Sequence, residues 1–228
     1  VCSSDLMIVA IDGPAATGKS TSAKLVAQKL SFTYLDTGAM YRCVTLAVLR
    51  DQISLDDERA FEQLLKSMNI QLDKTDDRLV VHLNGEDVST EIRKAKVTSQ
   101  VSAVSALPQV RSALVDFQRN IAKDQNCVME GRDIGTVVFP NAEFKFFLIA
   151  DDKIRAERRQ LDLLAIGEKK SIDELVEEIR QRDALDSGRS HSPLRKADDA
   201  IEVDTSKMTI NEQVDFMVNK VKTLTIGN

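Results

Sequence analysis

Residues 8–21 of this chain read IVAIDGPAATGKST, and this stretch constrains the fold more than any other. An apolar run ends at a Gly-Pro turn, and a helix-forming segment follows it. Gly13 to Ser20 match G-x-x-x-x-G-K-S, which between a strand and a helix is typical of a phosphate-binding loop. Such a loop aims several backbone N–H groups at one cluster of anionic oxygens, and the helix dipole adds to the attraction. The flanking strand and helix disfavour a chance glycine turn. We expect Lys19 to reach the β- and γ-phosphates and Ser20 to bind Mg²⁺.

The same alternation of strand and helix returns along the chain. Helices are predicted over 19–30, over 39–50 and from about 210, with Leu25, Val26 and Leu30 on one face of the first. Strands are predicted at 7–12, 32–35, 126–131, 143–150 and 199–204. Five strands interleaved with helices indicate an α/β fold with a doubly wound, five-stranded parallel sheet.

Two stretches interrupt this alternation and suggest added parts. Residues 68–105 have β-like alternation and the turn signal Asn84-Gly85, which predicts a small β-containing insert. Residues 151–171 are charged, helical in pattern and broken at Gly167, which we interpret as a mobile flap. The core domain is then expected over 7–67, 106–150 and 172–228. Residues 1–6, VCSSDL, stand outside the strand pattern, and we expect them to be an extension that does no chemistry.

Charge and cysteine content exclude several classes of protein. A net charge of −5 argues against a nucleic-acid-binding scaffold, and no apolar run is long enough to cross a membrane. Three widely separated cysteines fit neither a disulfide framework nor a metal site, which favours a reducing cytoplasm. In an acidic protein, an anionic ligand has to be held by a local cluster of positive groups.

A second anion site is suggested by two segments that follow strands. In DTGAMYR, Asp36 and Thr37 lie at a turn where Thr37 could cap the next helix, and Arg42 follows in its first turns. A helix cap with a surface arginine is an equally simple interpretation of that segment alone. EGRDIGT, residues 130–136, comes at the carboxyl end of a strand, where ligands bind in open α/β sheets. That position favours a functional role over a solvated turn.

Arginines gather on two further segments. Arg182, Asp186 and Arg189 are spaced i, i+4, i+7, which predicts one helix face. An exposed ladder of ion pairs is the alternative. Arg155, Arg158 and Arg159 share a face of the flap in the same way. Because the planar guanidinium can bind two phosphate oxygens and is always charged, these clusters favour phosphoryl transfer between two bound phosphates. A P-loop hydrolase is the weaker alternative, since no clear water-orienting residue or switch segment is seen.

Five segments carry a resemblance to a known family. GPAATGKST, DTGAMYR, LPQVR, EGRDIGTVVFP and RDALDSGR occur in this order, and on them the chain resembles the bacterial cytidylate kinases from residue 7 to near its end. The insert is similar to that family's enlarged monophosphate-binding region, and the flap to its lid. Glu130 stands where the family more often has an aspartate. The resemblance implies that ATP is bound by Gly13, Pro14, Ala15, Ala16, Thr17, Gly18, Lys19, Ser20 and Thr21.

The resemblance also implies a site for CMP. The monophosphate would be held by Arg42, Arg132 and Arg182, beside Asp36 and Thr37, with Asp186 on the ribose. Base contacts would fall to Ser102, Arg111 and Asp133, with Arg189 close by. Independently of any resemblance, an arginine can donate to O2 and N3 of cytosine, and an aspartate can accept from its amino group. Uracil reverses that pattern at N3 and at position 4, which leaves like groups facing each other in a closed site.

The activity implied by the resemblance is ATP- and Mg²⁺-dependent phosphorylation of CMP and dCMP. The catalytic residues would be Lys19, Arg132, Arg155, Arg158, Arg159 and Arg182. The attacking phosphate oxygen is already anionic, so no general base is needed. A P-loop kinase for shikimate, UMP or AMP is the nearest alternative, a P-loop regulatory ATPase with a protein partner is another, and a purely structural role is the weakest. The sequence does not rank ribose against deoxyribose. We expect a cytoplasmic monomer that binds neither nucleic acid nor membrane.

Overall fold

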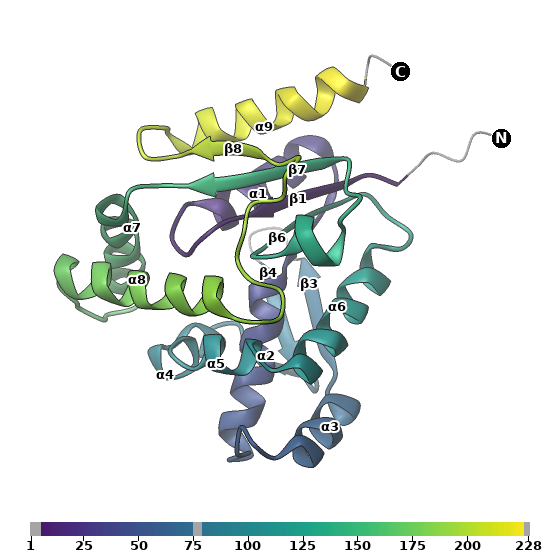
Figure 1. Cartoon of the computed structure of the whole chain (residues 1–228), viewed down its shortest axis with the longest axis vertical. Helices are drawn as coiled ribbons and strands as arrows, with labels where there is room; N and C mark the ends of the chain where they lie inside the picture. The colour runs from purple at the N-terminus through teal and green to yellow at the C-terminus, as the bar shows by residue number, and fades with distance from the viewer. Residues whose placement is uncertain (1–5, 75–78, 226–228) are drawn as a thin grey trace. The chain divides into compact units, whose positions relative to one another are not determined.

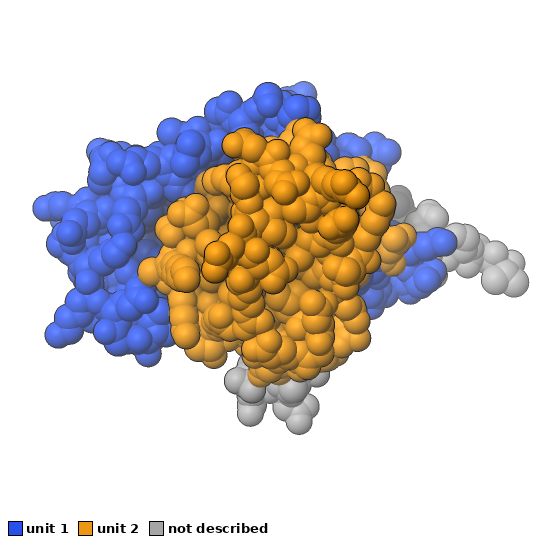
Figure 2. All heavy atoms as spheres, turned by 90° about the horizontal axis from the view of Figure 1, so that it is seen from below, with its two compact units in different colours: residues 1–35, 121–228 blue, residues 36–120 orange. Residues whose placement is uncertain are grey.

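The computed structural model describes residues 6–74 and 79–225. Residues 1–5 of the expected extension, 75–78 of the expected insert and 226–228 of the expected core domain lie outside this range. The chain divides into two compact units, coloured separately in Figure 2. Unit 1 comprises residues 1–35 and 121–228, and unit 2 comprises residues 36–120. The expected insert 68–105 lies wholly within unit 2, and the expected flap 151–171 lies within unit 1.

The sheet of unit 1 brings together the predicted strands (Figure 1). Its described strands are β1 (Ile8–Asp12), β2 (Thr33–Asp36), β6 (Cys127–Gly131), β7 (Phe144–Ile149) and β8 (Ile201–Asp204). Their order is β2-β6-β1-β7-β8, and the pairings of β1 with β6 and β7, and of β7 with β8, are parallel. The predicted α/β fold with a five-stranded, doubly wound sheet is confirmed. Every residue of β1 is buried, as expected for a central strand covered on both faces.

The helices of unit 1 explain how the sheet is covered. α1 (Lys19–Leu30) packs against α9 (Ile210–Thr225), and both contribute to the core formed by β1, β6 and β7. On α1 the fully buried face is formed by Ala23, Val26 and Ala27. The predicted face was therefore right at Val26, while Leu25 and Leu30 pack at the edge of this core.

A separate helix pair corresponds to the expected flap and the segment after it. α7 (Asp152–Ala165) packs against α8 (Ile172–Gly188) around a small apolar cluster of Ala156, Leu163, Leu175 and Ile179. Between the helices the backbone turns at Gly167, with φ 80°, as the sequence predicted. α8 begins with a capping box, in which Ser171 and Glu174 each bind the other's backbone N–H.

Unit 2 contains the long helix α2 (Thr37–Arg50), a small sheet and several short helices. The sheet order is β3-β4-β5, in antiparallel pairing. Asn84 and Gly85 join β4 to β5 and have φ values of 52° and 86°, the signature of a type I′ turn, which confirms the predicted turn. The other described elements are α3 (Glu58–Ser67), β3 (Ile70–Lys74), β4 (Leu79–Leu83), β5 (Glu86–Asp87), η1 (Glu91–Arg93), α4 (Ala95–Thr98), α5 (Val101–Ser105) and α6 (Pro108–Ala122).

Within the described residues, no helix combines the length and the apolar character needed to span a membrane.

Candidate functional site

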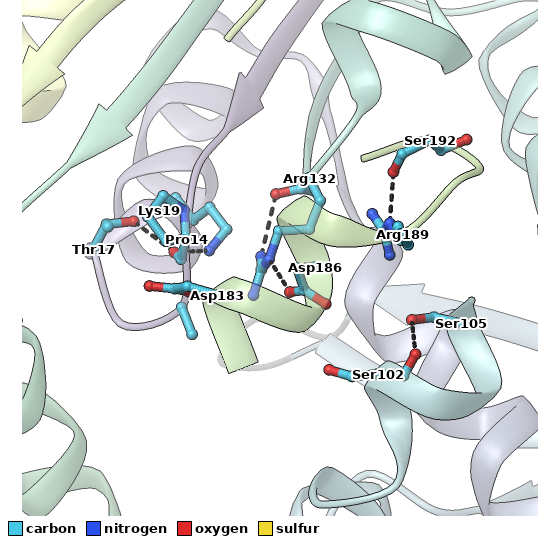
Figure 3. Close-up of polar contacts among 12 residues, drawn as sticks. Pro14, Thr17, Lys19, Ser102, Ser105, Arg132, Asp183, Asp186, Arg189 and Ser192 are labelled. Atoms are coloured by element: carbon cyan, nitrogen blue, oxygen red, sulfur yellow. Dashed lines mark hydrogen bonds and ion pairs between the residues drawn. The ribbon is translucent and has the colours of Figure 1, made fainter. Parts of the chain in front are cut away.

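The loop between β1 and α1 has a lysine folded back onto it. The Lys19 side chain is buried, and its Nζ donates a hydrogen bond to the carbonyl oxygen of Pro14 at 2.7 Å (Figure 3). The Thr17 hydroxyl donates to the same oxygen at 3.1 Å. α1 begins directly after Gly18, so its first N–H groups lie next to the loop and have no partner within the helix. The loop therefore has both the backbone donors and the ammonium group of a polyphosphate site.

Positive charge is concentrated around Lys19. Burial lowers the pKa of Lys19 well below its ordinary value, and repulsion from Arg132, Arg182 and Arg155 lowers it further, while Glu130 opposes these effects. The charged form of Lys19 is therefore disfavoured where it lies. Bound phosphates would favour the charged form of Lys19, because their negative charge attracts Lys19 and the nearby arginines at once.

Glu130 is the acidic member of this site. It lies at the end of β6 beside Ile11 of β1 and is 3 % exposed. Ser20 Oγ donates to Glu130 Oε2 at 2.6 Å, and the Tyr34 hydroxyl donates to Oε1. The sequence placed Glu130 in a candidate functional segment, residues 130–136, but did not indicate what Glu130 itself does. An acidic residue at the end of a strand next to the phosphate-loop strand is the signal that could have identified it.

Two flap arginines bind the backbone of the loop. Arg155 Nε donates to the carbonyl oxygen of Ala15 at 2.8 Å, and Arg158 Nη1 donates to that of Thr17 at 3.2 Å. Arg155 also forms an ion pair with Asp183 of α8, at 2.6 Å. Arg159 is partly buried on the same helix. α7 therefore supports the phosphate loop through two side chains that bind its carbonyl oxygens.

Thr205 completes this support from the end of β8. Its hydroxyl donates to the carbonyl oxygen of Thr17 at 2.9 Å and accepts from Arg158 Nη1 at 3.1 Å. Thr205 is fully buried. It is a second residue that the sequence analysis missed, since nothing local marks a threonine after a strand as part of a loop 188 residues away.

A second cluster in unit 1 surrounds Asp186. Arg132 Nε donates to Asp186 Oδ2 at 3.1 Å, and its Nη1 donates to the carbonyl oxygen of Gly131 at 3.2 Å (Figure 3). Burial acts to raise the pKa of Asp186, but Arg132, Arg182 and Arg189 outweigh it and hold that pKa below its ordinary value. The structure thus brings together Arg132, Arg182, Asp186 and Arg189, with the buried Asp133 next to Arg132 in the chain.

The prediction that Arg189 continues the helix face of Arg182 and Asp186 was wrong. α8 ends at Gly188, and Arg189 has φ −68° and ψ 143°, an extended conformation. Its Nε donates to the carbonyl oxygen of Ser192 at 2.6 Å (Figure 3). Arg189 still acts on Asp186 electrostatically, so its place in the cluster comes from the turn after the helix.

In unit 2 the predicted residues gather at the start of α2. The helix is capped by Asp36, which accepts from Ala39 N at 2.8 Å, so the expectation that Thr37 is the cap was wrong. Arg42 Nη2 lies 2.9 Å from Asp36 Oδ2, and Arg93 Nη2 lies 3.9 Å from it. Burial acts to raise the pKa of Asp36, but these two arginines prevail and lower it. Arg93 was not among the predicted residues.

Ser102 and Arg111 lie on neighbouring helices of unit 2. Arg111 on α6 is 4 % exposed, donates to the carbonyl oxygen of Ser105 at 3.2 Å, and lies with its guanidinium carbon 5.3 Å from the Tyr41 ring centre. Ser102 on α5 accepts, through its carbonyl oxygen, from the Ser105 hydroxyl at 3.2 Å. A buried arginine stacked on an aromatic ring is pre-oriented, which suits recognition of a planar ligand.

The fold and the loop define a class of protein: a P-loop kinase, in which a glycine-rich loop, its lysine and surrounding arginines serve phosphoryl transfer. A family model described as cytidylate kinase matches residues 9–223. The chain belongs to the cytidylate kinase family.

Individual relatives agree with this assignment. A cytidylate kinase of Chloroherpeton thalassium is 53 % identical over 215 residues, which cover 91 % of this chain and 90 % of the relative. A cytidylate kinase of Fusobacterium nucleatum subsp. nucleatum is 48 % identical and covers 96 % of this chain and 98 % of the relative. Among solved structures, an uncharacterized protein from Eubacterium ventriosum superposes with a TM-score of 0.51 at 11 % identity, over 95 % of this chain and 99 % of that one. This last likeness concerns the fold alone.

Proposed function

We propose that the chain transfers the γ-phosphoryl group of ATP to CMP and to dCMP, forming CDP and dCDP. The observation that carries the proposal is the buried Lys19 with Arg132, Arg155 and Arg182 acting on it, in a chain of the cytidylate kinase family. Such a concentration of cations is unfavourable without a ligand and is suited to two phosphate groups at once. The relatives named above carry the name cytidylate kinase.

The proposed mechanism needs positioning and charge neutralisation rather than a covalent nucleophile. ATP lies on residues 13–21, and Lys19 binds oxygens of the β- and γ-phosphates. The bond that breaks joins the γ-phosphorus to the oxygen that bridges these two phosphates. A phosphate oxygen of CMP attacks the γ-phosphorus in line, and ADP leaves. Arg132 and Arg182 bind the acceptor phosphate, while Arg155, Arg158 and Arg159 neutralise charge on the transferring group. Asp186 is proposed to contact the ribose, and Asp133 the cytosine amino group. The roles of Asp36, Thr37, Arg42, Ser102, Arg111 and Arg189 in binding CMP stay predictions from sequence.

The residues around Ser20 suit a magnesium ion. Ser20 Oγ and Glu130 Oε2 lie 2.6 Å apart, so a hydroxyl and a carboxylate oxygen are available together. Among the described residues no group of three or more His, Cys, Asp or Glu could hold a metal by itself. Mg²⁺ at nucleotide sites typically uses one or two protein oxygens together with phosphates. Bound there, Mg²⁺ would neutralise charge on the ATP phosphates, with Ser20 and Glu130 holding it from the protein side.

Replacing Glu130 by glutamine tests the metal site. Glu130→Gln is expected to raise the Mg²⁺ concentration for half-maximal activity by about 10-fold or more, because a charged oxygen donor is lost. Glu130→Asp should stay close to the parent, and Glu202→Gln, at an exposed position of β8, is the matched charge control. Thermal unfolding with ATP, with and without Mg²⁺, gives a second readout. An unchanged Mg²⁺ dependence and an unchanged Mg²⁺-dependent shift in Tm would mean that Glu130 only orients Tyr34.

Acceptor preference tests the proposed function itself. Initial rates of ADP formation are measured with CMP, dCMP, UMP, AMP and shikimate in parallel, together with a control without acceptor. We expect kcat/KM for CMP and dCMP to exceed that for UMP by about 100-fold or more, because a mispaired polar group in a closed site is poorly tolerated. Asp133→Ala should reduce this ratio. Equal rates with CMP and UMP would show that Asp133 does not select for cytosine. ADP formation that no acceptor increases would indicate an ATPase.

The state of the cysteine thiols is informative about the compartment in which the chain acts. Burial raises the pKa of the Cys43 thiol to about 12 and that of Cys127 to about 11, so both thiols stay protonated and slow to oxidise. Cys2 lies outside the described residues. Two buried, unpaired thiols in the described chain support our proposal of a reducing cytoplasm. We propose that the chain acts there as a monomer, without nucleic acid or membrane.

A further inference from the structure

Asp12 makes an unusual contact at the end of β1. The residue precedes the first glycine of the phosphate loop and is 5 % exposed. Its Oδ1 accepts from the backbone N–H of Ile134 at 2.9 Å, and its Oδ2 accepts from that of Gly135 at 2.8 Å. One carboxylate thus binds two successive N–H groups of a segment more than 120 residues away in the chain.

These N–H groups open η2 (Ile134–Val138), a single turn of π-helix. The first N–H groups of a helix have no partner within it, so they need an acceptor from elsewhere. Asp133 occupies the N-cap position, but its side chain makes no capping hydrogen bond within the described chain. Asp12 therefore caps this helix from another strand. The residues held nearest to the cap are Arg132 and Asp133, which the proposed function assigns to CMP.

The chain just beyond η2 is also held. Lys145 of β7 is buried and donates from Nζ to the carbonyl oxygen of Pro140 at 2.5 Å, and to Asp199 at 2.7 Å. Lys145 lies beside Ala10 of β1 in the sheet. The segment after β6 is therefore attached at both ends to side chains of the central strands. Turns of π-helix occur frequently at functional sites, where they set the direction of a side chain.

Burial acts against the charged form of the Asp12 carboxylate. Burial raises the pKa of Asp12 to about 6; the N–H bonds from Gly135 and Ile134 oppose this, Asp133 adds to it, and Arg132 opposes it. Folding thus disfavours the ionised form that accepts both N–H groups. The two N–H bonds place this carboxylate at the junction between the phosphate loop and the turn that carries Arg132 and Asp133.

We propose that Asp12 is a positioning residue that holds Arg132 and Asp133 in register with the phosphate loop, and so helps to set the preference for cytosine over uracil. This inference rests on the proposed function, because it assigns Asp12 an action through residues that would bind CMP. Since Asp12 is covalently next to Gly13, a single residue fixes both the start of the ATP loop and the turn that carries the acceptor-binding side chains.

Asp12→Asn is the sharpest variant. It keeps the size of the side chain and one oxygen acceptor, but its NH2 group cannot accept from the second N–H. We expect the ratio of kcat/KM for CMP to that for UMP to fall by about 10-fold, the equivalent of one hydrogen bond at the base. KM for CMP should rise, while KM for ATP changes by less than about 3-fold. Asp57→Asn is the control, since Asp57 also caps a helix, by accepting from Ala60 N of α3, but lies at an exposed position.

Hydrogen exchange of the Ile134 and Gly135 amides reports the contact directly. These amides should be protected in the parent and should exchange faster in Asp12→Asn. Faster exchange with parental kinetic constants would overturn the proposal and leave Asp12 a purely structural role. If Asp12→Asn does not fold, Asp12→Glu keeps the carboxylate but displaces it by a methylene, and a parental CMP-to-UMP ratio in that variant would also overturn it. A parent enzyme without activity on CMP would instead refute the proposed function.

Discussion

We expect Lys19→Met to lower kcat by about 10³-fold and, at the same time, to make the protein without ligand more stable. The loss of activity follows from the removal of the ammonium group that would bind the transferring phosphate. The gain in stability follows from the lowered pKa of Lys19, because burial and the nearby arginines disfavour its charged form in the folded state. A buried charge replaced by an apolar side chain of similar length is often stabilising by about 1 kcal/mol or more.

The two effects are separated by chemical denaturation without ligand and by thermal shift with ATP. The free energy of unfolding should rise in Lys19→Met, and the stabilisation by ATP should largely vanish. Lys24→Met removes the same charge from an exposed position of the same helix and should change neither quantity appreciably. A destabilised Lys19→Met protein would show that the hydrogen bond to Pro14 outweighs the repulsion, and the electrostatic argument for an anion site would then fail.

Gly13→Ala is expected to destabilise the fold by about 3 kcal/mol or more and to abolish measurable ATP binding. Gly13 has φ 146°, which disfavours any other residue, and a Cβ there would lie 2.2 Å from the carbonyl oxygen of Leu148 in β7. That oxygen belongs to the backbone of the central sheet, so the loop has to move instead. Moving the loop displaces the N–H groups that would bind the phosphates.

Two other glycines separate the clash from the backbone strain. Gly85 has φ 86° but no described atom within 4 Å of a Cβ, so Gly85→Ala should cost about 1 kcal/mol from strain alone. Gly188 lies at the end of α8 with open space around it, and Gly188→Ala should be close to neutral. Urea unfolding of the three variants should give this order. Equal destabilisation of Gly13→Ala and Gly85→Ala would show that the sheet accommodates the added methyl group.

The strands of unit 1 could be predicted from sequence within one or two residues. β1, β2 and β8 end at an aspartate and β6 ends at a glycine, while β7 is a mostly apolar run that ends at Ile149. Local pattern and tertiary structure therefore agree. The hairpin at Asn84-Gly85 was predictable for the same reason, because only a few residue pairs suit two positive φ angles. Local rules were less reliable at helix ends. Asp36 and Thr37 both have side chains that can cap a helix, and the sequence did not decide between them. Arg189 has the i, i+7 spacing of a helix face from Arg182, but α8 ends one residue before it.

The contacts that assemble the site had no local pattern. Ser20 meets Glu130 across 110 residues, and Asp12 meets Ile134 across 122. These pairs form because β6 is the neighbour of β1 in the sheet. The pattern of apolar residues in each strand does not predict which strands are neighbours. The residue types at strand ends indicated where a site would lie. Which side chain binds which backbone group required the fold.

The hydrogen bonds from α7 to the phosphate loop have a thermodynamic consequence. Arg155 and Arg158 bind the carbonyl oxygens of Ala15 and Thr17, so a ligand that moves either guanidinium away from the loop would break its bond to a loop oxygen. The conformation of α7 and the affinity of the loop are then linked equilibria. Linkage is reciprocal, so any factor by which ATP shifts the position of α7 equals the factor by which immobilising α7 in that position changes the affinity for ATP. A crosslink between α7 and α8 that holds α7 in one position would therefore change the affinity for ATP, as a bound effector does.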